Sequence, residues 1–247
     1  MNAIRSFLFG AWLYACIFFF GLGLLLLRLF GRWPVIVGVR AWAHAVLFGA
    51  RLICGIRVEV RGTENLPAEG FILASKHQSM LDTVAPWTFI KDPAFVLKKE
   101  LLSLPIYGWV VGGMKHIPID REGGSGALTK MMNAAREAVA LKRAIIIYPE
   151  GTRRDVGAPP DYKVGVAGIY RDLNAPCVPV ALNTGLVWPA RGLPSHGGTA
   201  VFEILPAIPP GLPRAAFMRE LSARIETASN TLANIPNSND QAAEASS

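Results

Sequence analysis

The chain has 247 residues, 51% of them hydrophobic, which fits one domain, or one domain with an appendage, and indicates that part of it is solvated by something other than water. Lysine and arginine exceed aspartate and glutamate by 25 to 18, which favours an anionic partner, and membrane lipid, nucleic acid or a phosphorylated substrate would all fit. The three cysteines have no CxxC spacing, which argues against a disulfide framework and a zinc site.

The first element in chain order is an uncharged apolar stretch. Residues 6–27 carry no charge, with Arg5 before them and Arg28 and Arg32 after them. As a helix, this stretch would be about 33 Å long, close to the roughly 30 Å of a bilayer's hydrocarbon core. A signal peptide would be shorter and would end in small residues, whereas residues 24–27 are leucines that lead straight to Arg28. We expect a membrane-inserted helix, with a buried core helix as the alternative.

A second apolar stretch, residues 35–56, is interrupted by Arg40, His44 and Arg51. On a helix these three side chains fall within about 40° of one another, forming a basic stripe on an apolar cylinder. Such a helix suits the membrane interface, with its cations toward lipid phosphates. It could also pack on the domain, or form a hairpin in one leaflet with the first helix, hinged at residues 31–34.

The rest of the chain alternates strand and helix patterns. We expect strands at 56–61, 71–74, 94–97, 116–121, 144–148, 178–182 and 199–205. We expect helices at 81–90, 126–142 and 214–233. This order predicts a single α/β domain with a mixed, mainly parallel sheet flanked by helices, preceded by a hydrophobic two-helix membrane motif. The expected division is 1–55 for membrane anchoring, 56–235 for the domain and 236–247 for a disordered tail.

His77 and Asp82 stand between an expected strand and an expected helix. Five positions apart on a regular helix, the two side chains would point about 140° away from each other, so they meet only if the chain turns between them. With His77 on the loop and Asp82 in the first helical turn, the carboxylate could reach back to the imidazole and form a general-base dyad. The alternative is a surface histidine and a helix-capping aspartate that never touch.

Two further loops carry groups that suit an anion. The strand ending at Tyr148 leads into the loop 149–154, and the short strand near residue 119 leads into Asp120 and Arg121. Ligand groups gather at the carboxyl ends of strands in open α/β sheets, and arginines from separate strand ends can bind a phosphate bidentately. Each arginine alone could equally form a surface salt bridge.

Together, four motifs resemble the sequence blocks of the glycerolipid acyltransferases, especially the 1-acylglycerol-3-phosphate acyltransferases. In order they are His77-x4-Asp82, Ile119-Asp120-Arg121, Pro149-Glu150-Gly151-Thr152-Arg153 and Val178-Pro179-Val180. The resemblance runs from about Val58 to Leu205. A single HxxxxD is common by chance, so the order, the spacing and the hydrophobic N-terminus carry the identification.

The resemblance implies that residues 56–235 are an acyltransferase domain. It implies that His77 is the base, that Asp82 orients it and that a second group of residues binds the substrate, namely Arg121, Glu150, Gly151, Thr152 and Arg153, with Lys98 and Lys99 adding positive charge. The implied reaction moves a fatty acyl group from a thioester to the sn-2 hydroxyl of 1-acylglycerol 3-phosphate and gives phosphatidic acid. Tyr148 stands where the family usually has phenylalanine.

The resemblance also implies the partners. We expect acyl-CoA or acyl-carrier protein as the acyl donor, with no cofactor and no metal, and a phospholipid membrane and lysophosphatidate as the other partners. The enzyme would be at the membrane, with its catalytic domain on the cytoplasmic face, and would bind no nucleic acid. Another lysolipid, such as a lyso-ornithine lipid or a lysophospholipid, remains open as the acceptor.

Competing classes of function lack their motifs. A serine hydrolase would carry GxSxG, and residues 123–127 have alanine where its last glycine should be. A nucleotide-binding protein would carry GxxxxGK[ST] or a strand-linked GxGxxG, and neither is present. A non-catalytic membrane protein that binds anionic lipid is the remaining alternative.

Overall fold

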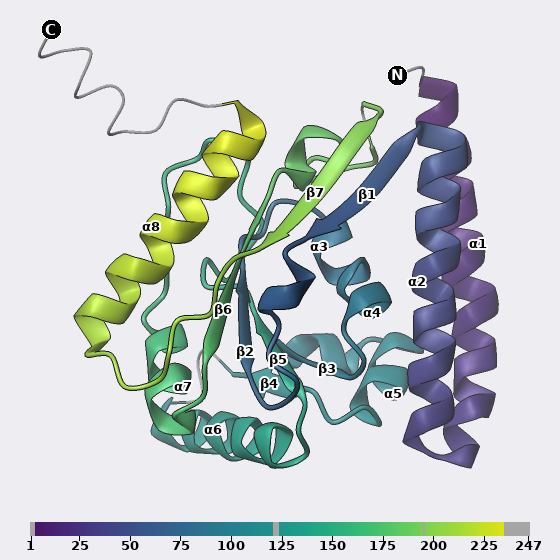
Figure 1. The fold of residues 1–247 in the computed structure, drawn as a ribbon. Helices are drawn as coiled ribbons and strands as arrows, with labels where there is room; N and C mark the ends of the chain where they lie inside the picture. Colours follow the sequence, from purple (N-terminus) through teal and green to yellow (C-terminus); the bar gives the residue numbers. More distant parts are fainter. Residues whose placement is uncertain (1–2, 121–123, 195, 235–247) are drawn as a thin grey trace, which may run out of the picture.

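The computed structural model describes residues 3–120, 124–194 and 196–234 (Figure 1). Helix α1 (Ala3–Leu27) and helix α2 (Arg32–Cys54) form a pair along one side of the molecule, joined by the short 3-10 helix η1 (Arg28–Phe30). Gly31, with φ of 102°, makes the turn between them, in a conformation that glycine adopts without strain. Arg121 and the expected tail at 236–247 lie outside the described residues.

Within the described residues, seven strands form one sheet in the order β1-β7-β6-β2-β5-β3-β4. The strands are β1 (Ile56–Arg61), β2 (Ile72–Ser75), β3 (Pro93–Lys98), β4 (Ile117–Ile119), β5 (Ala144–Ile147), β6 (Cys177–Leu182) and β7 (Gly198–Ile204). All neighbours are parallel except β6 and β7. The predicted mixed, mainly parallel α/β sheet is therefore confirmed.

The strands of this sheet carry hydrophobic side chains on both faces, and helices cover both faces and bury them. In β2, Ile72 and Ala74 belong to one hydrophobic cluster and Leu73 to the other, as the twofold alternation of a strand requires. One face packs against α6 (Gly124–Ala140), α7 (Gly165–Leu173) and α8 (Arg214–Ala233), and the other against α2, α3 (Leu81–Val84) and α4 (Pro86–Phe89). The remaining pieces are α5 (Tyr107–Gly112) and the 3-10 helices η2 (Thr63–Asn65), η3 (Lys99–Ser103) and η4 (Thr184–Leu186).

The structure differs from the sequence-based elements in three places. The helix expected at 81–90 is two short helices, and α4 begins at Pro86, whose missing N–H and fixed φ suit a first helical position. Helices α5 and α7 had not been predicted. The extended piece expected at 116–121 is a strand only over β4 within the described residues.

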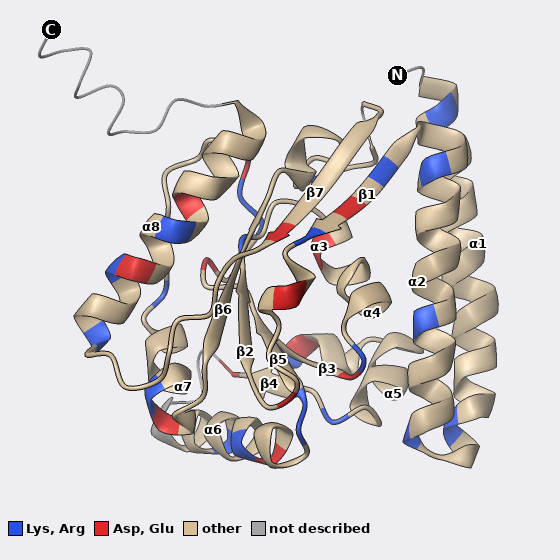
Figure 2. Cartoon of the chain, viewed as in Figure 1, with Lys and Arg blue, Asp and Glu red and all other residues tan. Residues whose placement is uncertain are grey.

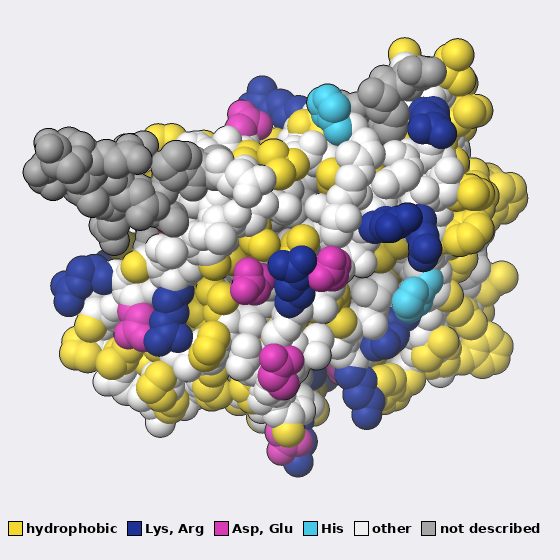
Figure 3. Space-filling view, turned by 45° about the horizontal axis from the view of Figure 1, so that its top comes forward, with side chains coloured by type: hydrophobic (Ala, Val, Ile, Leu, Met, Phe, Trp, Pro, Cys, Tyr) yellow, Lys and Arg dark blue, Asp and Glu magenta, His cyan; other side chains and the backbone are white. Residues whose placement is uncertain are grey.

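The outer side of the helix pair is apolar. Neither helix contains an acidic residue, and Figure 2 shows only isolated basic positions along them. Large side chains such as Phe7, Phe19 and Leu26 are 73%, 70% and 65% exposed, and Figure 3 shows hydrophobic side chains gathered along this side of the molecule. Both helices are long and apolar enough to cross a membrane by length and composition.

The basic stripe expected on α2 is divided. His44 and Arg51 are exposed, but the Arg40 guanidinium donates hydrogen bonds to the carbonyls of Ile90 and Lys91, at 3.0 and 3.2 Å. Carbonyls at the end of a helix lack intrahelical donors, and those following α4 accept from Arg40. Arg40 therefore fastens α2 to the domain and does not face outward with the other two.

Arginines also fasten the turn of the helix pair to the domain. Arg28 donates to the carbonyl of Trp109, and Arg32 donates to the carbonyl of Met114 and to the carboxylate of Asp92. The buried Arg143 donates to the same Asp92 carboxylate at 3.2 Å and also to main-chain carbonyls. The carboxylate thus lies between two guanidinium groups, and hydrogen bonds hold the helix pair at the turn.

Candidate active site

The carboxyl ends of β2, β5 and β6 meet at one edge of the sheet. These three strands are neighbours and run parallel, so the loops that follow them lie side by side. They deliver His77, Tyr148 with Glu150, and Thr184. The sequence predicted that the loops after β2 and β5 follow the ends of strands, and the loop after β6 had not been considered.

The chain turns between His77 and Asp82, as a dyad requires. The Nδ1 atom of His77 lies 2.9 Å from Oδ2 of Asp82. The same oxygen accepts hydrogen bonds from the main-chain N–H groups of Gln78 at 2.6 Å and Ser79 at 2.8 Å. These donors close the turn around the carboxylate, so the predicted contact between the two side chains is confirmed.

Asp82 is held on its other side by a residue that the sequence analysis missed. Thr184, fully buried and 102 positions away, donates its hydroxyl to Oδ1 of Asp82 at 2.6 Å. With N–H and O–H donors on both oxygens, the carboxylate is oriented as an acceptor for a hydrogen on Nδ1 of His77. That tautomer leaves a lone pair on Nε2, the atom that a base would use.

Tyr148 supports both members of the dyad. Its ring stacks on the imidazole of His77, with 4.1 Å between ring centroids and 21° between planes. Its hydroxyl donates to the main-chain carbonyl of Asp82 at 2.5 Å. Burial, with the nearby charge of Asp82, raises the pKa of Tyr148 well above its usual value, so the hydroxyl remains a donor. Phenylalanine could provide the stacking and not this hydrogen bond.

Glu150 lies behind His77 and is almost fully buried. One carboxylate oxygen accepts from the main-chain N–H of His77 and the other from the ammonium of Lys76, both at 3.3 Å. Desolvation raises the pKa of the Glu150 carboxyl, and the Lys76 charge opposes that shift. The carboxylate thus contacts the loop that carries the histidine, whereas the resemblance had associated it with the substrate.

The other residues of the same motif take different positions. Gly151 adopts φ of 67° and makes the turn after Glu150. Thr152 and Arg153 are exposed, and Arg153 makes no hydrogen bond or ion pair with any residue that the structure describes. The main-chain N–H of Arg154 donates to the carbonyl of His77 at 2.8 Å, which keeps this loop against the dyad.

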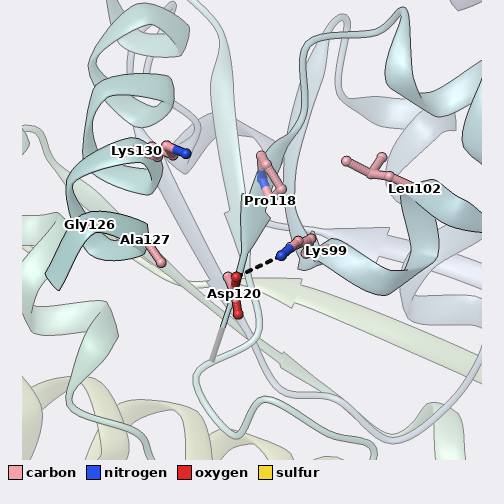
Figure 4. Close-up of a pocket in the computed structure, with 7 residues that line it drawn as sticks. All are labelled: Lys99, Leu102, Pro118, Asp120, Gly126, Ala127 and Lys130. Carbon is pink, nitrogen blue, oxygen red and sulfur yellow. Dashed lines mark hydrogen bonds and ion pairs between the residues drawn. The ribbon is translucent and has the colours of Figure 1, made fainter. Parts of the chain in front are cut away.

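The two lysines expected near the substrate lie farther along the same edge. Lys98 ends β3 and Lys99 begins η3, and β5 separates β3 from β2. Lys99 pairs with Asp120 at 2.8 Å beside a hollow of about 320 Å³, with Lys130 of α6 on its other side (Figure 4). The structure thus gathers His77, Asp82, Glu150 and the Arg153 loop, and places the lysines two strands away from β2.

Comparisons with known proteins identify the family of this chain. The sequence model of a family described as Acyltransferase matches residues 57–183. A 1-acyl-sn-glycerol-3-phosphate acyltransferase of Pseudomonas aeruginosa is 34% identical over 198 residues, which are 80% of this chain and 77% of that protein. The alpha form from Mus musculus is 29% identical over 56% of this chain and 50% of its own length.

The fold has a solved counterpart. The crystal structure of the 1-acyl-sn-glycerophosphate acyltransferase PlsC from Thermotoga maritima superimposes with a TM-score of 0.77 and 22% identity, over 96% of this chain and 100% of that one. At this identity the superposition supports the fold alone. The match of the family's sequence model and the Pseudomonas relative carry the assignment: this chain belongs to the acyltransferase family.

Proposed function

We propose that this chain moves a fatty acyl group from a thioester to the sn-2 hydroxyl of 1-acylglycerol 3-phosphate, giving phosphatidic acid. The observation that carries the chemistry is the dyad, in which a carboxylate held by three further donors orients the His77 imidazole. The names of the relatives support this choice of acceptor. The His77 side chain is 13% exposed, which leaves a narrow access for a substrate hydroxyl.

In the proposed reaction Nε2 of His77 takes the proton of the hydroxyl while the hydroxyl oxygen attacks the thioester carbonyl carbon. The tetrahedral intermediate then breaks its C–S bond, and the departing sulfur takes the proton from the imidazolium. Asp82 stabilises the imidazolium between the two steps. A thioester is already activated, so no acyl-enzyme is needed, and a positioned base contributes about 10² to 10⁴ in rate.

Arg153 is the main proposed phosphate ligand. It is exposed and follows Glu150 and Gly151 on the loop that packs against His77, and no described residue occupies its guanidinium. A phosphate held there would fix which hydroxyl meets Nε2. Lys98 and Lys99 are proposed to add positive charge farther along the edge, and the proposal extends to Thr152 and Arg121.

The helix pair gives the proposed enzyme access to lipid. We propose that the exposed apolar side of α1 and α2 is buried in a bilayer and that the domain works on its cytoplasmic face. Acyl-CoA or acyl-carrier protein is the proposed donor. The support is the length, hydropathy and exposure of the two helices.

The test uses His77→Ala in detergent-purified full-length protein, supplied with acyl-CoA and 1-acylglycerol 3-phosphate. We expect phosphatidate formation to fall by about 10² or more, because the proton acceptor is gone. If this variant forms phosphatidate at the wild-type rate, His77 is not the base. A panel of other lysolipids, including a lyso-ornithine lipid, identifies the acceptor if 1-acylglycerol 3-phosphate is not used.

Arg153→Ala tests phosphate recognition. A charge-assisted hydrogen bond contributes about 1.5 to 3 kcal/mol, so we expect the KM for the phosphorylated acceptor to rise by about 10- to 100-fold. Arg171→Ala is the matched control, since Arg171 is exposed on α7, which covers the face of the sheet opposite α3 and α4. An unchanged KM in Arg153→Ala would show that this guanidinium does not bind the phosphate.

A further inference from the structure

Helix α8 follows the segment that the family's sequence model matches, yet one of its faces contacts two of the loops around the dyad. Glu226, Ser229 and Leu232 are spaced three apart and lie on that face. Ser229 accepts from the N–H of Leu182 at 3.2 Å, and the carbonyl of Leu232 accepts from the side chain of Asn183 at 3.1 Å. These contacts hold the end of β6 directly before the threonine that binds Asp82.

Glu226 contacts the loop that carries the dyad itself. The ammonium of Lys76, 2% exposed, donates to both carboxylate oxygens of Glu226, at 2.7 and 2.8 Å. The hydroxyl of Tyr162 donates to the same carboxylate at 2.8 Å. A buried ammonium is stable only when it is paired and hydrogen-bonded, so Lys76 depends on Glu226 and on its longer contact with Glu150.

A continuous set of hydrogen bonds joins α8 to the histidine. Glu226 binds Lys76, Lys76 binds one oxygen of Glu150, and the other oxygen of Glu150 binds the main-chain N–H of His77. Lys76 also precedes His77 directly in the chain. The loop is therefore tied to α8 through the Lys76 side chain, and the main chain of His77 is tied to Glu150, which shares Lys76 with Glu226.

We propose that Glu226 is a positioning residue, which holds Lys76 and Glu150 so that the loop keeps His77 in place for proton transfer. The inference rests on the proposed role of His77 as the base. Glu226 touches neither reacting group, and it acts through two charged neighbours whose arrangement changes if it is removed. A displacement of a reacting group by about 1 Å can cost about 10² in rate, so kcat is the quantity affected.

Three variants of the full-length protein in detergent test this role. We expect Glu226→Ala to lower kcat by about 10- to 100-fold with little change in the acceptor KM, since only positioning is lost. Glu226→Gln keeps an oxygen for Lys76 and Tyr162 and is expected to recover part of the rate. Glu220→Ala is the control, because Glu220 lies on the same helix and pairs with Arg224, and we expect wild-type kcat.

A second readout needs no substrate. The chain has four histidines, and the Nδ1 proton of His77 can be assigned in a ¹⁵N-histidine NMR spectrum by its loss in His77→Ala. We expect this resonance to shift or broaden in Glu226→Ala and to stay in place in Glu220→Ala. The NMR result decides the positioning role even if wild-type protein forms no phosphatidate, which would overturn the proposed function instead.

Three results would overturn the inference. One is a Glu226→Ala protein with wild-type kcat and an unshifted His77 resonance. Another is a Glu226→Ala protein in which the acceptor KM rises and kcat is unchanged, because Glu226 would then bind the substrate. The third is an equal kcat loss in Glu220→Ala, which would mean that any weakening of α8 has the same effect. If Glu226→Ala does not fold, Glu226→Gln is judged by the same kcat and NMR measurements.

Discussion

Asp82→Asn separates the charge of the dyad from its geometry. The Oδ2 atom of Asp82 accepts from two main-chain N–H groups, which cannot become acceptors. The asparagine oxygen must therefore occupy the Oδ2 position, still facing Nδ1 of His77. Its amide nitrogen then faces Thr184, whose hydroxyl can rotate and accept. The variant keeps the turn and the tautomer and loses the negative charge.

The expected loss follows from these contacts. In a Ser-His-Asp triad the same change costs about 10⁴ because the wrong tautomer results. Here the main-chain donors preserve the tautomer, so only the stabilisation of the imidazolium by charge is lost. At 2.9 Å and an effective dielectric constant of about 20, a full charge pair is worth at most about 6 kcal/mol, and the amide dipole retains part of it. We expect a loss of about 3 kcal/mol, which is roughly 10² in kcat.

The assay follows thiol release from acyl-CoA by purified protein with 1-acylglycerol 3-phosphate, and it compares kcat and KM. Asp172→Asn is the control, because Asp172 pairs with Arg136 on the face of the sheet opposite α3. Circular dichroism checks that both variants are folded. A wild-type kcat in Asp82→Asn would refute the reasoning, and so would a loss that appears only in KM.

Three further predictions concern stability. Tyr148→Phe keeps the ring on His77 and leaves one carbonyl unpaired, so we expect the free energy of unfolding to fall by about 1 kcal/mol with kcat changed less than about threefold; a larger kcat loss would contradict this. A Cβ on Gly108 would lie 2.0 Å from the carbonyl oxygen of Leu102, so Gly108→Ala should lower Tm and the control Gly112→Ala, with no atom within 4 Å, should not. Burial and two nearby arginines lower the pKa of His116 from 6.5 to about 3. Between pH 6.5 and about 3 only the unfolded chain binds a proton at this histidine. The free energy of unfolding should therefore fall as the pH is lowered through this range, by up to about 1.4 kcal/mol per pH unit. In urea titrations, His116→Gln should make this dependence on pH less steep.

The dyad could be proposed from sequence, beside the alternative of two side chains that never touch, because its contacts are local. Asp82 meets His77, Gln78 and Ser79 within five positions, and the turn that joins them follows from a strand ending before a helix. The parallel sheet was predictable for a similar reason, since alternating strand and helix patterns imply crossover connections. Short-range patterns therefore gave the fold class, whereas the spacing of His77 and Asp82 left their contact open and the resemblance of the four motifs implied their roles.

The residues that support the dyad from a distance could not be read in this way. Thr184 is 102 positions from Asp82, and Glu226 is 150 positions from Lys76, so neither pairing leaves a periodic signal. Glu150 was assigned to the substrate from its motif, and only the structure reveals that both its oxygens contact the loop. The nine residues of α7 were missed because a segment this short, opening at Gly165, resembles a loop.

The arginine contacts at the turn between α1 and α2 restrict how the domain can move on a membrane. A flexible linker would let the domain rotate freely above its anchor, but Arg28, Arg32 and Arg40 attach the pair to the domain at separate points. With the pair seated in a bilayer as proposed, the domain keeps one orientation relative to the lipid surface. A lipid acceptor that diffuses in that plane then approaches the carboxyl edge of the sheet from a fixed direction. The acceptor therefore reaches His77 by diffusion in two dimensions, and the domain does not have to rotate.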